Sequence, residues 1–284
     1  MKQYVKTFES FEKLLEYNSE HKDYVLSNQD KFTIAYEVEL SARSHFESPY
    51  DLVDSFEGVF KSLLNKYDIN TETDNSLTDT SYYTGVEMVP EDYFNGITHA
   101  FQFLDDFYAM YNKQKQFFFS KKTGLHINIG YKGVTQWNVV KGYLLLNDDF
   151  SYKGFEDRKQ SHYAASFKQE FKDKAAIKLM KKFPEMNSII YKTNITEIES
   201  ILTDVIKSIA RARGDKHIGF NINKLDTMNY VEFRYPGGVL SIDAIKGATI
   251  NYCNIIQAMA DPNYRRVNYF NKLSNFVESL YVKA

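Results

Sequence analysis

The sequence predicts an α+β protein in which helices pack on one face of a mainly antiparallel sheet, while acidic residues line the other, open face. Three observations support this fold class. Several segments alternate apolar and polar residues, as half-buried strands do, and others have apolar residues at helical spacing. These segments follow one another as strand, helix, strand, helix, strand, helices, hairpin and helices, which does not repeat as βαβ units. The charged residues of the strands lie opposite the apolar ones.

The first half of the chain contains three predicted strands separated by helices. The elements are, in order, a helix at 4–17, a strand at 32–43, a helix at 49–66, a polar loop at 70–81, a strand at 82–89, a helix at 92–114 and a strand at 123–130. Pro90 ends the strand at 82–89 because proline has no N–H to donate to a sheet. We expect residues 1–20 to form an N-terminal helical segment and residues 21–284 to form a single domain.

The second half is predicted to be mainly helical, with one hairpin. Its elements are helices at 134–147, 163–183 and 195–212, a polar loop at 148–162, a short strand at 189–191, hairpin strands at 216–222 and 229–235, and closing helices at 241–260 and 266–280. The proline and two glycines that begin at Pro236 end the hairpin.

Composition excludes several classes of protein. Of the 284 residues, 43% are hydrophobic and 16% aromatic, which is ample for a sizeable core. The formal net charge of −2 predicts neither a nucleic-acid nor a membrane partner. The single cysteine, Cys253, excludes an intrachain disulfide and argues against a cysteine-based zinc site. The chain lacks a secretory signal and a run of about 18 apolar residues, so we expect a cytoplasmic protein.

The strand at 123–130 suggests a site rather than a plain sheet surface. Leu125, Ile127 and Ile129 fall on one side, where they can pack on a core. His126 and Asn128 fall on the other side between glycines, so a potential metal ligand and a polar neighbour have open space around them. Three further predicted strands repeat this arrangement.

Together the four strands direct potential ligands toward one side of the sheet. The residues concerned are Glu37, Glu39, Glu87, His126, Asn128, Glu232 and Arg234. Four carboxylates in one place repel each other and raise each other's pKa values unless a cation is present. Oxygen-rich clusters with an imidazole suit Mg²⁺ or Mn²⁺. Two such ions with a nucleotide between them would use this many ligands, with arginine neutralising phosphate charge.

Each residue also has a simpler interpretation. A solvated strand face alternates in the same way, although this face has almost no lysine or threonine. Glu37 and Glu39 could be a surface pair, and His126 could be a structural histidine. Glu232 and Arg234 could form a salt bridge. Further polar residues near these strands, Asp74 and Arg158, could be an ordinary turn residue and an ordinary loop charge.

The ordered motifs resemble those of a known family. They are Tyr36-Glu-Val-Glu39, Asp74-Asn-Ser-Leu77, Thr84-Gly-Val-Glu-Met-Val-Pro90, Thr123-Gly-Leu-His-Ile-Asn-Ile-Gly130 and Val231-Glu-Phe-Arg234. Together they resemble the amidoligase family of the carboxylate–amine ligase superfamily, which is related in fold to the catalytic domain of glutamine synthetase. The resemblance runs from about Phe32 to about Ala258 and depends on the order and spacing of short blocks.

This resemblance implies a curved antiparallel sheet that binds two Mg²⁺ ions and ATP. The implied metal ligands are Glu37, His126 and Glu232 for one ion, and Glu39 and Glu87 for the other. The implied nucleotide and substrate contacts are Arg234 with the phosphates or an acyl phosphate, Arg158 with a phosphate or carboxylate, and Asp74 with the incoming amine. Asn128 stands where relatives often carry a histidine, and it can still hydrogen-bond phosphate. Ala35 and Asn75 replace glycines that are common in the family.

The implied activity is an ATP-dependent carboxylate–amine ligase that forms an amide through an acyl phosphate. Its partners would be a small-molecule or peptide carboxylate and an amine. Two alternatives remain: a phosphotransferase on the same fold, and a non-catalytic binding or virion-associated module. The stretch Lys6-Thr-Phe-Glu-Ser-Phe11 faintly resembles the starts of tailed-bacteriophage proteins, which would place the chain in a host cytoplasm. The sequence leaves the oligomeric state open.

Overall fold

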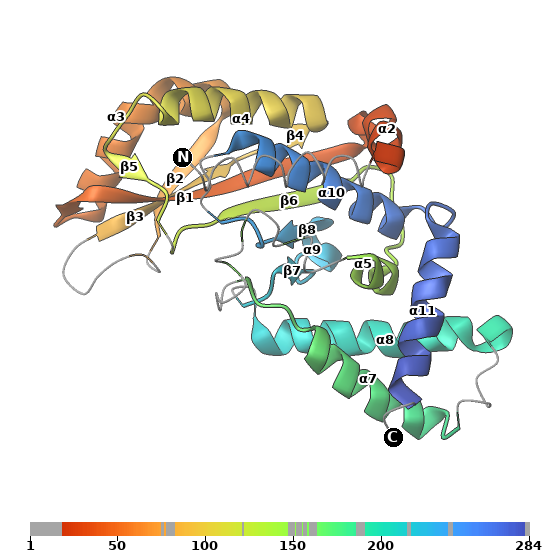
Figure 1. Ribbon diagram of the computed structural model, residues 1–284. Coiled ribbons are helices and arrows are strands. Elements are labelled where there is room, and N and C mark those ends of the chain that lie inside the picture. Colours follow the sequence, from red (N-terminus) through yellow and green to blue (C-terminus); the bar gives the residue numbers. More distant parts are fainter. Residues whose placement is uncertain are drawn as a thin grey trace, which may run out of the picture.

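The computed structural model describes residues 19–74, 77, 83–120, 122–146, 151, 155, 158, 164–185, 191–214, 217–237 and 241–281. The side chains of residues 19–21 and 191–193 are not part of this description. Within these residues the chain is an α+β protein built on an open antiparallel sheet (Figure 1).

The sheet is centred on one long strand, β1. Its main path runs β2-β3-β1-β6-β8-β7, and the short strands β4 and β5 also pair with β1. The strands are β1 (Phe32–Phe46), β2 (Ile69–Thr73), β3 (Tyr83–Pro90), β4 (Phe94–Asn95), β5 (Phe117–Phe118), β6 (Leu125–Tyr131), β7 (Phe220–Asn221) and β8 (Tyr230–Phe233). All the pairings are antiparallel, as the sequence predicts for most of the sheet.

Helices fill most of the rest of the described chain. They are α2 (Ser19–Ser27), η1 (Gln29–Lys31), α3 (Pro49–Tyr67), α4 (Ile97–Tyr111), α5 (Val139–Leu145), α7 (Lys168–Lys182), α8 (Tyr191–Arg213), α9 (Leu225–Met228), α10 (Ile242–Ala260) and α11 (Arg266–Tyr281). None of the described helices is long and apolar enough to cross a lipid bilayer.

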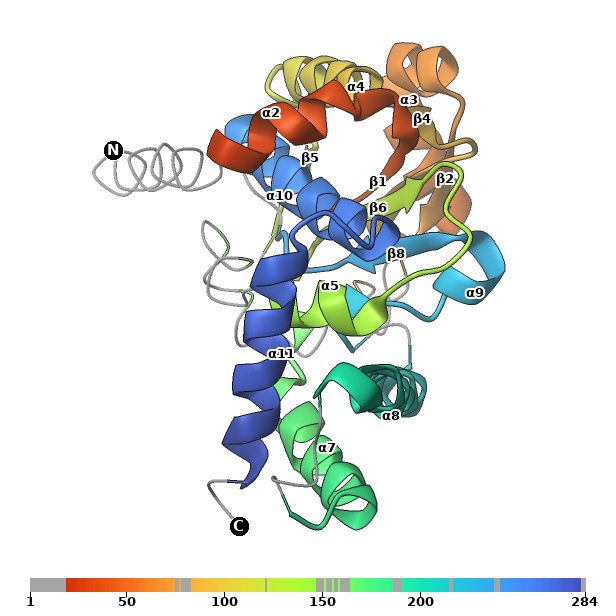
Figure 2. The same ribbon diagram turned by 90° about the vertical axis from the view of Figure 1, so that its right-hand side faces the viewer.

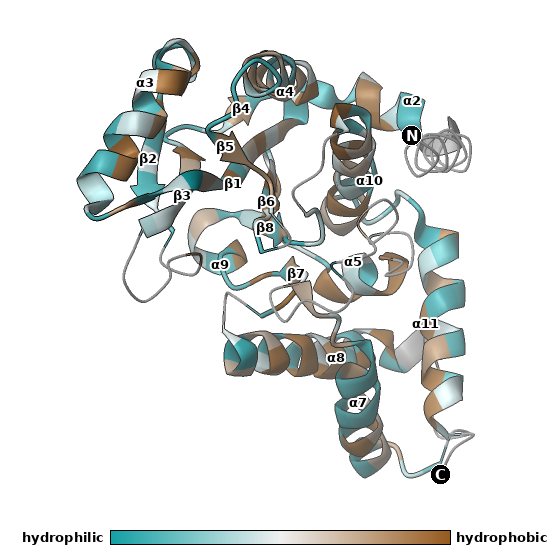
Figure 3. Ribbon diagram, turned by 60° about the vertical axis from the view of Figure 1, so that its left-hand side comes forward, coloured by the Kyte–Doolittle hydropathy of each residue, from teal (hydrophilic) through white to brown (hydrophobic). Residues whose placement is uncertain are grey.

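The core lies between the apolar face of the sheet and helices α3, α4 and α10 (Figure 1). Figure 3 shows that α10 is largely apolar, whereas α3 and α4 alternate apolar and polar stripes. Two contacts join α10 to this face. Tyr36 of β1 hydrogen-bonds Thr249 at 2.9 Å, and the ring of Phe233 in β8 stacks on Tyr252 with the ring centroids 4.1 Å apart. The apolar residues of the central strands therefore point toward the helices, and the polar residues between them point to the opposite face of the sheet.

A second group of helices lies below the β7–β8 end of the sheet. Figures 1 and 2 show α7 and α8 beside each other, with α11 running down past α5 toward them. Aromatic residues hold this group together. The buried ring of Tyr143 in α5 stacks on Phe167 with the centroids 4.7 Å apart, and the buried Phe171 of α7 stacks on the half-buried Phe276 of α11 at 5.0 Å.

Several predicted elements need correction. Residues 69–73 form strand β2 rather than the start of a loop, because Ile69–Thr73 pairs with β3 along its whole length. The helix predicted from residue 92 begins at Ile97, since Phe94–Asn95 pairs with β1 and Gly96 has a φ of +86°. The strand predicted at 189–191 is wrong at Tyr191, which begins α8. The predicted hairpin is present as β7 and β8, but the short helix α9 connects them.

Two predicted elements lie wholly or mostly outside the described residues. These are the N-terminal helix at 4–17 and the polar loop at 148–162, of which residues 151, 155 and 158 are described. Helix α2 was not predicted, because its nine residues are mainly polar and lack an apolar stripe.

Candidate functional site

Strand register brings the predicted ligands together on the polar face of the sheet. Glu39 of β1 pairs directly with Glu87 of β3, and Glu37 of β1 pairs with His126 of β6. One step further across the sheet, Asn128 of β6 pairs with Glu232 of β8. Directly opposed residues point to the same face, so four strands contribute to one cluster of side chains. We call this set, together with Arg234, the acidic face.

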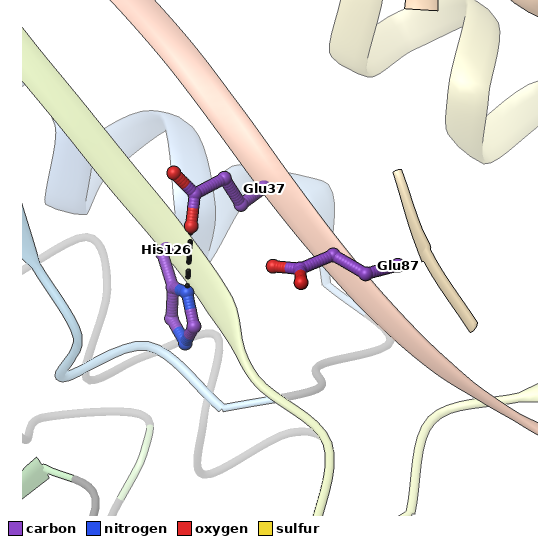
Figure 4. A group of neighbouring side chains, drawn as sticks. All are labelled: Glu37, Glu87 and His126. Carbon is purple, nitrogen blue, oxygen red and sulfur yellow. Dashed lines mark hydrogen bonds and ion pairs between the residues drawn. The ribbon is translucent and has the colours of Figure 1, made fainter. Parts of the chain in front are cut away.

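His126 lies at the centre of the acidic face, within reach of three carboxylates. Its Nδ1 is 3.1 Å from Glu37 and 3.5 Å from Glu232, and its Nε2 is 3.4 Å from Glu39. Figure 4 shows the imidazole facing Glu37, with Glu87 approaching from the neighbouring strand. One ligand atom from each of Glu37, Glu87 and His126 lies within 4.8 Å of the others. The structure thus gathers both oxygen and nitrogen donors at one point.

Glu232 is fixed by neighbours on both sides. Arg234, two residues along the chain, donates to one of its carboxylate oxygens at 2.5 Å. Asn221 of β7 donates to the other oxygen at 2.7 Å. The salt bridge considered from the sequence is therefore present, and it also holds a carboxylate 3.5 Å from His126.

Two glycines make room for Arg158 to reach the acidic face. Gly124 and Gly237 form an isolated bridge between two segments, and a Cβ on either would lie 3.0–3.2 Å from the Arg158 side chain. Arg158 is only 4% exposed, and its guanidinium lies 3.5 Å from the carbonyl oxygens of Thr123 and Arg234. A residue predicted to lie in a polar loop is thus buried beside the site, because the glycines leave a channel for it.

Asp74 lies in a turn against strand β3. Its backbone N–H donates to Gly85 at 2.9 Å, and its carbonyl accepts from Leu77 at 3.1 Å. A Cβ on Gly85 would overlap Leu77 and the Asp74 carbonyl, so only glycine fits there. The Asp74 carboxylate contributes to the raised pKa of Glu87 and is therefore near it. Asp74 is therefore a turn residue, as one interpretation of the sequence predicts, and it also lies beside the acidic face.

The carboxylates of the acidic face differ in how well they are neutralised. Burial, reinforced by the charges of Glu37, Glu39 and Asp74, raises the pKa of Glu87 to about 8. Burial also acts to raise the pKa of Glu37, but hydrogen bonds from His126 and Asn128 more than offset it and hold the pKa below its ordinary value. Glu87 is therefore the carboxylate in greatest need of a cation.

The acidic face is less open than the sequence predicts. Glu39, His126, Asn128 and Glu232 are 8%, 2%, 1% and 6% exposed, respectively. These side chains contact one another, and the buried Arg158 lies against the same part of the sheet. Burial strengthens every charge–charge interaction in the cluster relative to a solvated strand face.

Two tyrosines near the acidic face were missed in the sequence. The Tyr93 hydroxyl interacts with Asn128 and with Glu37, and burial, together with Tyr230 beside it, raises the pKa of Tyr93 far above its ordinary value. The rings of Tyr93 and Tyr230 lie 5.2 Å apart. The sequence predicts a helix at Tyr93 and therefore does not indicate that it lies near the site. In the structure Phe94 pairs with Ile34 of β1, which places Tyr93 next to Ala35. Asn221 was also missed, although it lies in a predicted hairpin strand.

The donor atoms fit a divalent cation. Carboxylate oxygens with one imidazole suit Mg²⁺ or Mn²⁺ better than zinc. Among the described residues, His126 Nε2 and Asn128 Oδ1 are buried without a hydrogen-bond partner. Burial and Arg234 act to lower the pKa of His126, but Glu39, Glu37 and Glu232 more than offset them and raise it, so a cation at Nε2 would take the place of the ring proton. The resemblance to the amidoligases implies that Glu39 and Glu87 hold a second ion. The two carboxylates are cross-strand neighbours, and that shared role stays a prediction.

Comparisons with known proteins give only distant structural similarity. No protein family matches the sequence, and no curated protein does. Among solved structures, a cryo-electron microscopy structure of glutamine synthetase from Plasmodium falciparum aligns with 88% of this chain at 15% identity and a TM-score of 0.36. The chain spans about half of that protein, 55% of its length. Similarity at this level assigns neither a family nor an activity, so membership of the amidoligase family stays a prediction.

Proposed function

We propose that this chain is an ATP-dependent carboxylate–amine ligase that uses two Mg²⁺ ions, with Mn²⁺ as a substitute. One observation carries the proposal. The polar face of an antiparallel sheet buries His126 among Glu37, Glu39 and Glu232, with Glu87 close by and two arginines at its border. A solvated strand face would have no reason to bury this many carboxylates around one imidazole. The sequence motifs that supply these residues are those that resemble the amidoligases.

The residues divide into metal-binding and charge-neutralising groups. Glu37, His126 and Glu232 would hold one ion, and Glu39 with Glu87 would hold the other. When bound, ATP would supply the phosphoryl group, and the two ions would neutralise part of its negative charge. The proposed ligands are preorganised by strand pairing, so binding the ions would require little reorganisation.

The arginines and Asp74 would act on the substrates. Arg234 and Arg158 converge from different segments, and both guanidinium groups are largely buried, which strengthens their attraction for an anion. They would orient the phosphoryl group and the substrate carboxylate. Asp74, beside Glu87, would accept a proton from the incoming amine.

The proposed reaction has two balanced steps. A carboxylate oxygen attacks the γ-phosphorus of ATP, ADP leaves, and an acyl phosphate forms. The amine nitrogen then attacks the acyl carbon, inorganic phosphate leaves, and the amine loses a proton. No protein nucleophile is needed, and Cys253 is buried in α10 with a pKa raised by burial, in keeping with a core role.

A pooled-substrate assay tests this proposal. The chain is incubated with ATP, Mg²⁺, a pool of amino acids and peptides as acids, and a pool of amines, and phosphate release is measured. We expect release only when acid and amine are both present, and we expect hydroxylamine to replace the amine by trapping the acyl phosphate as a hydroxamate. Glu37→Gln should abolish release, whereas Glu91→Gln, at an exposed residue beyond β3, should not. A phosphorylated product formed without amine would instead indicate a phosphotransferase.

A further inference from the structure

A pocket away from the acidic face is large enough for a small molecule. It has a volume of about 860 Å³ and lies where α5, α8, the end of α10 and α11 meet the loop at 133–138. Figures 1 and 2 show α11 running past α5 and continuing beyond the level of α8. Its size falls within the range typical of ligand sites. The residues that matter for recognition are Trp137, Lys141, Glu199, Arg266 and Phe270.

Lys141 places a buried positive charge in this pocket. Its side chain is 1% exposed, although lysine is among the residues that are least often fully buried, and most of the rest of α5 is apolar and buried. The ammonium group donates to the backbone carbonyl of Asp261 at 2.7 Å. In the described part of the chain, no carboxylate oxygen lies within 4 Å of it. An ammonium has three N–H donors, so two remain for a ligand.

The carboxylates nearest to Lys141 are engaged elsewhere. Glu199 accepts a hydrogen bond from Asn138 at 3.0 Å and another from the Tyr269 hydroxyl. The Asp261 carboxylate accepts from two backbone N–H groups in the turn that follows α10, at 2.8 and 3.3 Å. Burial lowers the pKa of Lys141 to about 8; Asp261 and Glu199 act against this shift, and Arg265 and Arg266 act with it. The ammonium is therefore less well stabilised in the pocket than in water, and an anion bound beside it would offset that cost.

The rim of the pocket adds a second cation and aromatic surfaces. The Arg266 guanidinium lies over the ring of Phe270, 5.3 Å from its centroid. Arg266 is exposed and forms no ion pair with any described residue. Trp137 donates from Nε1 to Asn229 at 2.8 Å, which fixes its ring in the wall of the pocket. An exposed arginine beside a buried ammonium is a suitable arrangement for binding an oxyanion at two points.

We propose that this pocket binds a small molecule that carries an oxyanion, either a carboxylate or a phosphate, held between Lys141 and Arg266 with its body against Trp137. The site is separate from the acidic face, and its existence does not depend on the ligase activity proposed above. Removing the Lys141 charge would remove a charge-assisted hydrogen bond in a buried setting, which is worth about 1.5–3 kcal/mol, or a tenfold to hundredfold change in affinity.

Trp137 provides a direct readout because it is the only tryptophan in the chain. The full chain is titrated with inorganic phosphate and, separately, with benzoate, while tryptophan fluorescence and calorimetry are recorded. Sodium chloride at equal ionic strength is the control. We expect saturable binding of at least one of the two oxyanions, and the comparison shows which oxyanion is preferred.

Three variants make the test specific. Lys141→Gln keeps a donor for Asp261 but removes the charge, and we expect at least a tenfold loss of affinity. Arg266→Gln, at an exposed position where folding is not at risk, should weaken binding several-fold. Lys178→Gln, at an exposed lysine of α7, should bind as the wild type does. The proposal is overturned if neither anion binds below about 10 mM by either method, or if Lys141→Gln and Arg266→Gln both bind like the wild type.

Discussion

The carboxylate of Glu87 provides the sharpest test of why the acidic face exists. Glu87 is largely buried beside Glu37, Glu39 and Asp74, and its pKa is raised from 4.5 to about 8. In metal-free protein, folding at about pH 7 must therefore either protonate Glu87 or bury an uncompensated charge. Replacing it with glutamine removes this penalty while keeping the size of the side chain. We predict that Glu87→Gln is more stable than the wild type when metal is absent.

The size of this effect follows from linkage. The folded pKa lies above the unfolded one, so the stability contribution is present below about pH 4.5 and is lost as pH rises through about 8. Each pKa unit corresponds to about 1.4 kcal/mol, and Glu87 is not wholly enclosed, so we expect a gain of about 1–3 kcal/mol at about pH 7. This corresponds to about 2–6 °C in melting temperature for a chain of this size. The gain should shrink toward about pH 5.

The assay is thermal unfolding in EDTA and in excess Mg²⁺. Wild-type protein should gain about 1.4 kcal/mol from Mg²⁺ at tenfold its dissociation constant, whereas Glu87→Gln should gain much less. Glu91→Gln removes an exposed carboxylate and should stay within about 0.5 kcal/mol of the wild type in both conditions. The reasoning is refuted if Glu87→Gln is no more stable than the wild type in EDTA and responds equally to Mg²⁺.

Four further substitutions test the packing and the buried charge around the two sites. Gly124→Ala places a methyl group 3.0 Å from Glu39 and His126 of the acidic face and 3.2 Å from Arg158. Metal titrations should therefore show weaker Mg²⁺ binding, and unfolding should show a stability loss of at most about 2 kcal/mol. Gly142→Ala would place its Cβ in severe overlap with Met259, and urea unfolding should show a loss of about 1–3 kcal/mol in stability. Gly58→Ala, whose Cβ would meet no other atom, should gain about 0.5–1 kcal/mol. If Gly142→Ala were the more stable of the two variants, this packing would be contradicted. The pKa of Lys141 is lower in the folded protein than in the unfolded chain, so the wild type becomes more stable as its ammonium loses its proton. Relative to Lys141→Gln, the wild type should gain about 1–3 kcal/mol in unfolding free energy as pH rises from about 8 to about 10.5. No change in this difference with pH would contradict the burial of the ammonium.

The sequence predicts the central strands well because their side chains alternate strictly. In β1 and β6 the apolar residues pack on helices and the polar residues face away, and this parity alone places Glu37 and His126 on one side. Strand β2 was missed because Ile69–Thr73 is mostly polar, and only its hydrogen bonds to β3 make it a strand. Tyr93 was missed for a related reason: its position depends on pairing with a strand some 60 residues away in sequence.

The contacts within the two sites could not be predicted from the sequence. Parity places His126 and Glu232 on one face, but it does not reveal that Asn221 and Arg234 hold Glu232 beside the imidazole. The burial of Arg158 depends on two glycines from separate segments. The pocket around Lys141 is built from helices that are far apart in the chain, so no local pattern indicates it.

Metal-dependent nucleotide binding tests the central claim most directly. Calorimetry is performed with ATP in Mg²⁺ and in EDTA on the wild type, Glu232→Ala and Glu91→Ala, with circular dichroism to verify folding. The account predicts saturable binding that requires Mg²⁺, is weakened at least tenfold in Glu232→Ala and is unchanged in Glu91→Ala. A folded wild-type protein that binds no ATP, or a Glu232→Ala variant that binds it equally well, would contradict the account and favour a scaffold that uses its acidic face for another purpose.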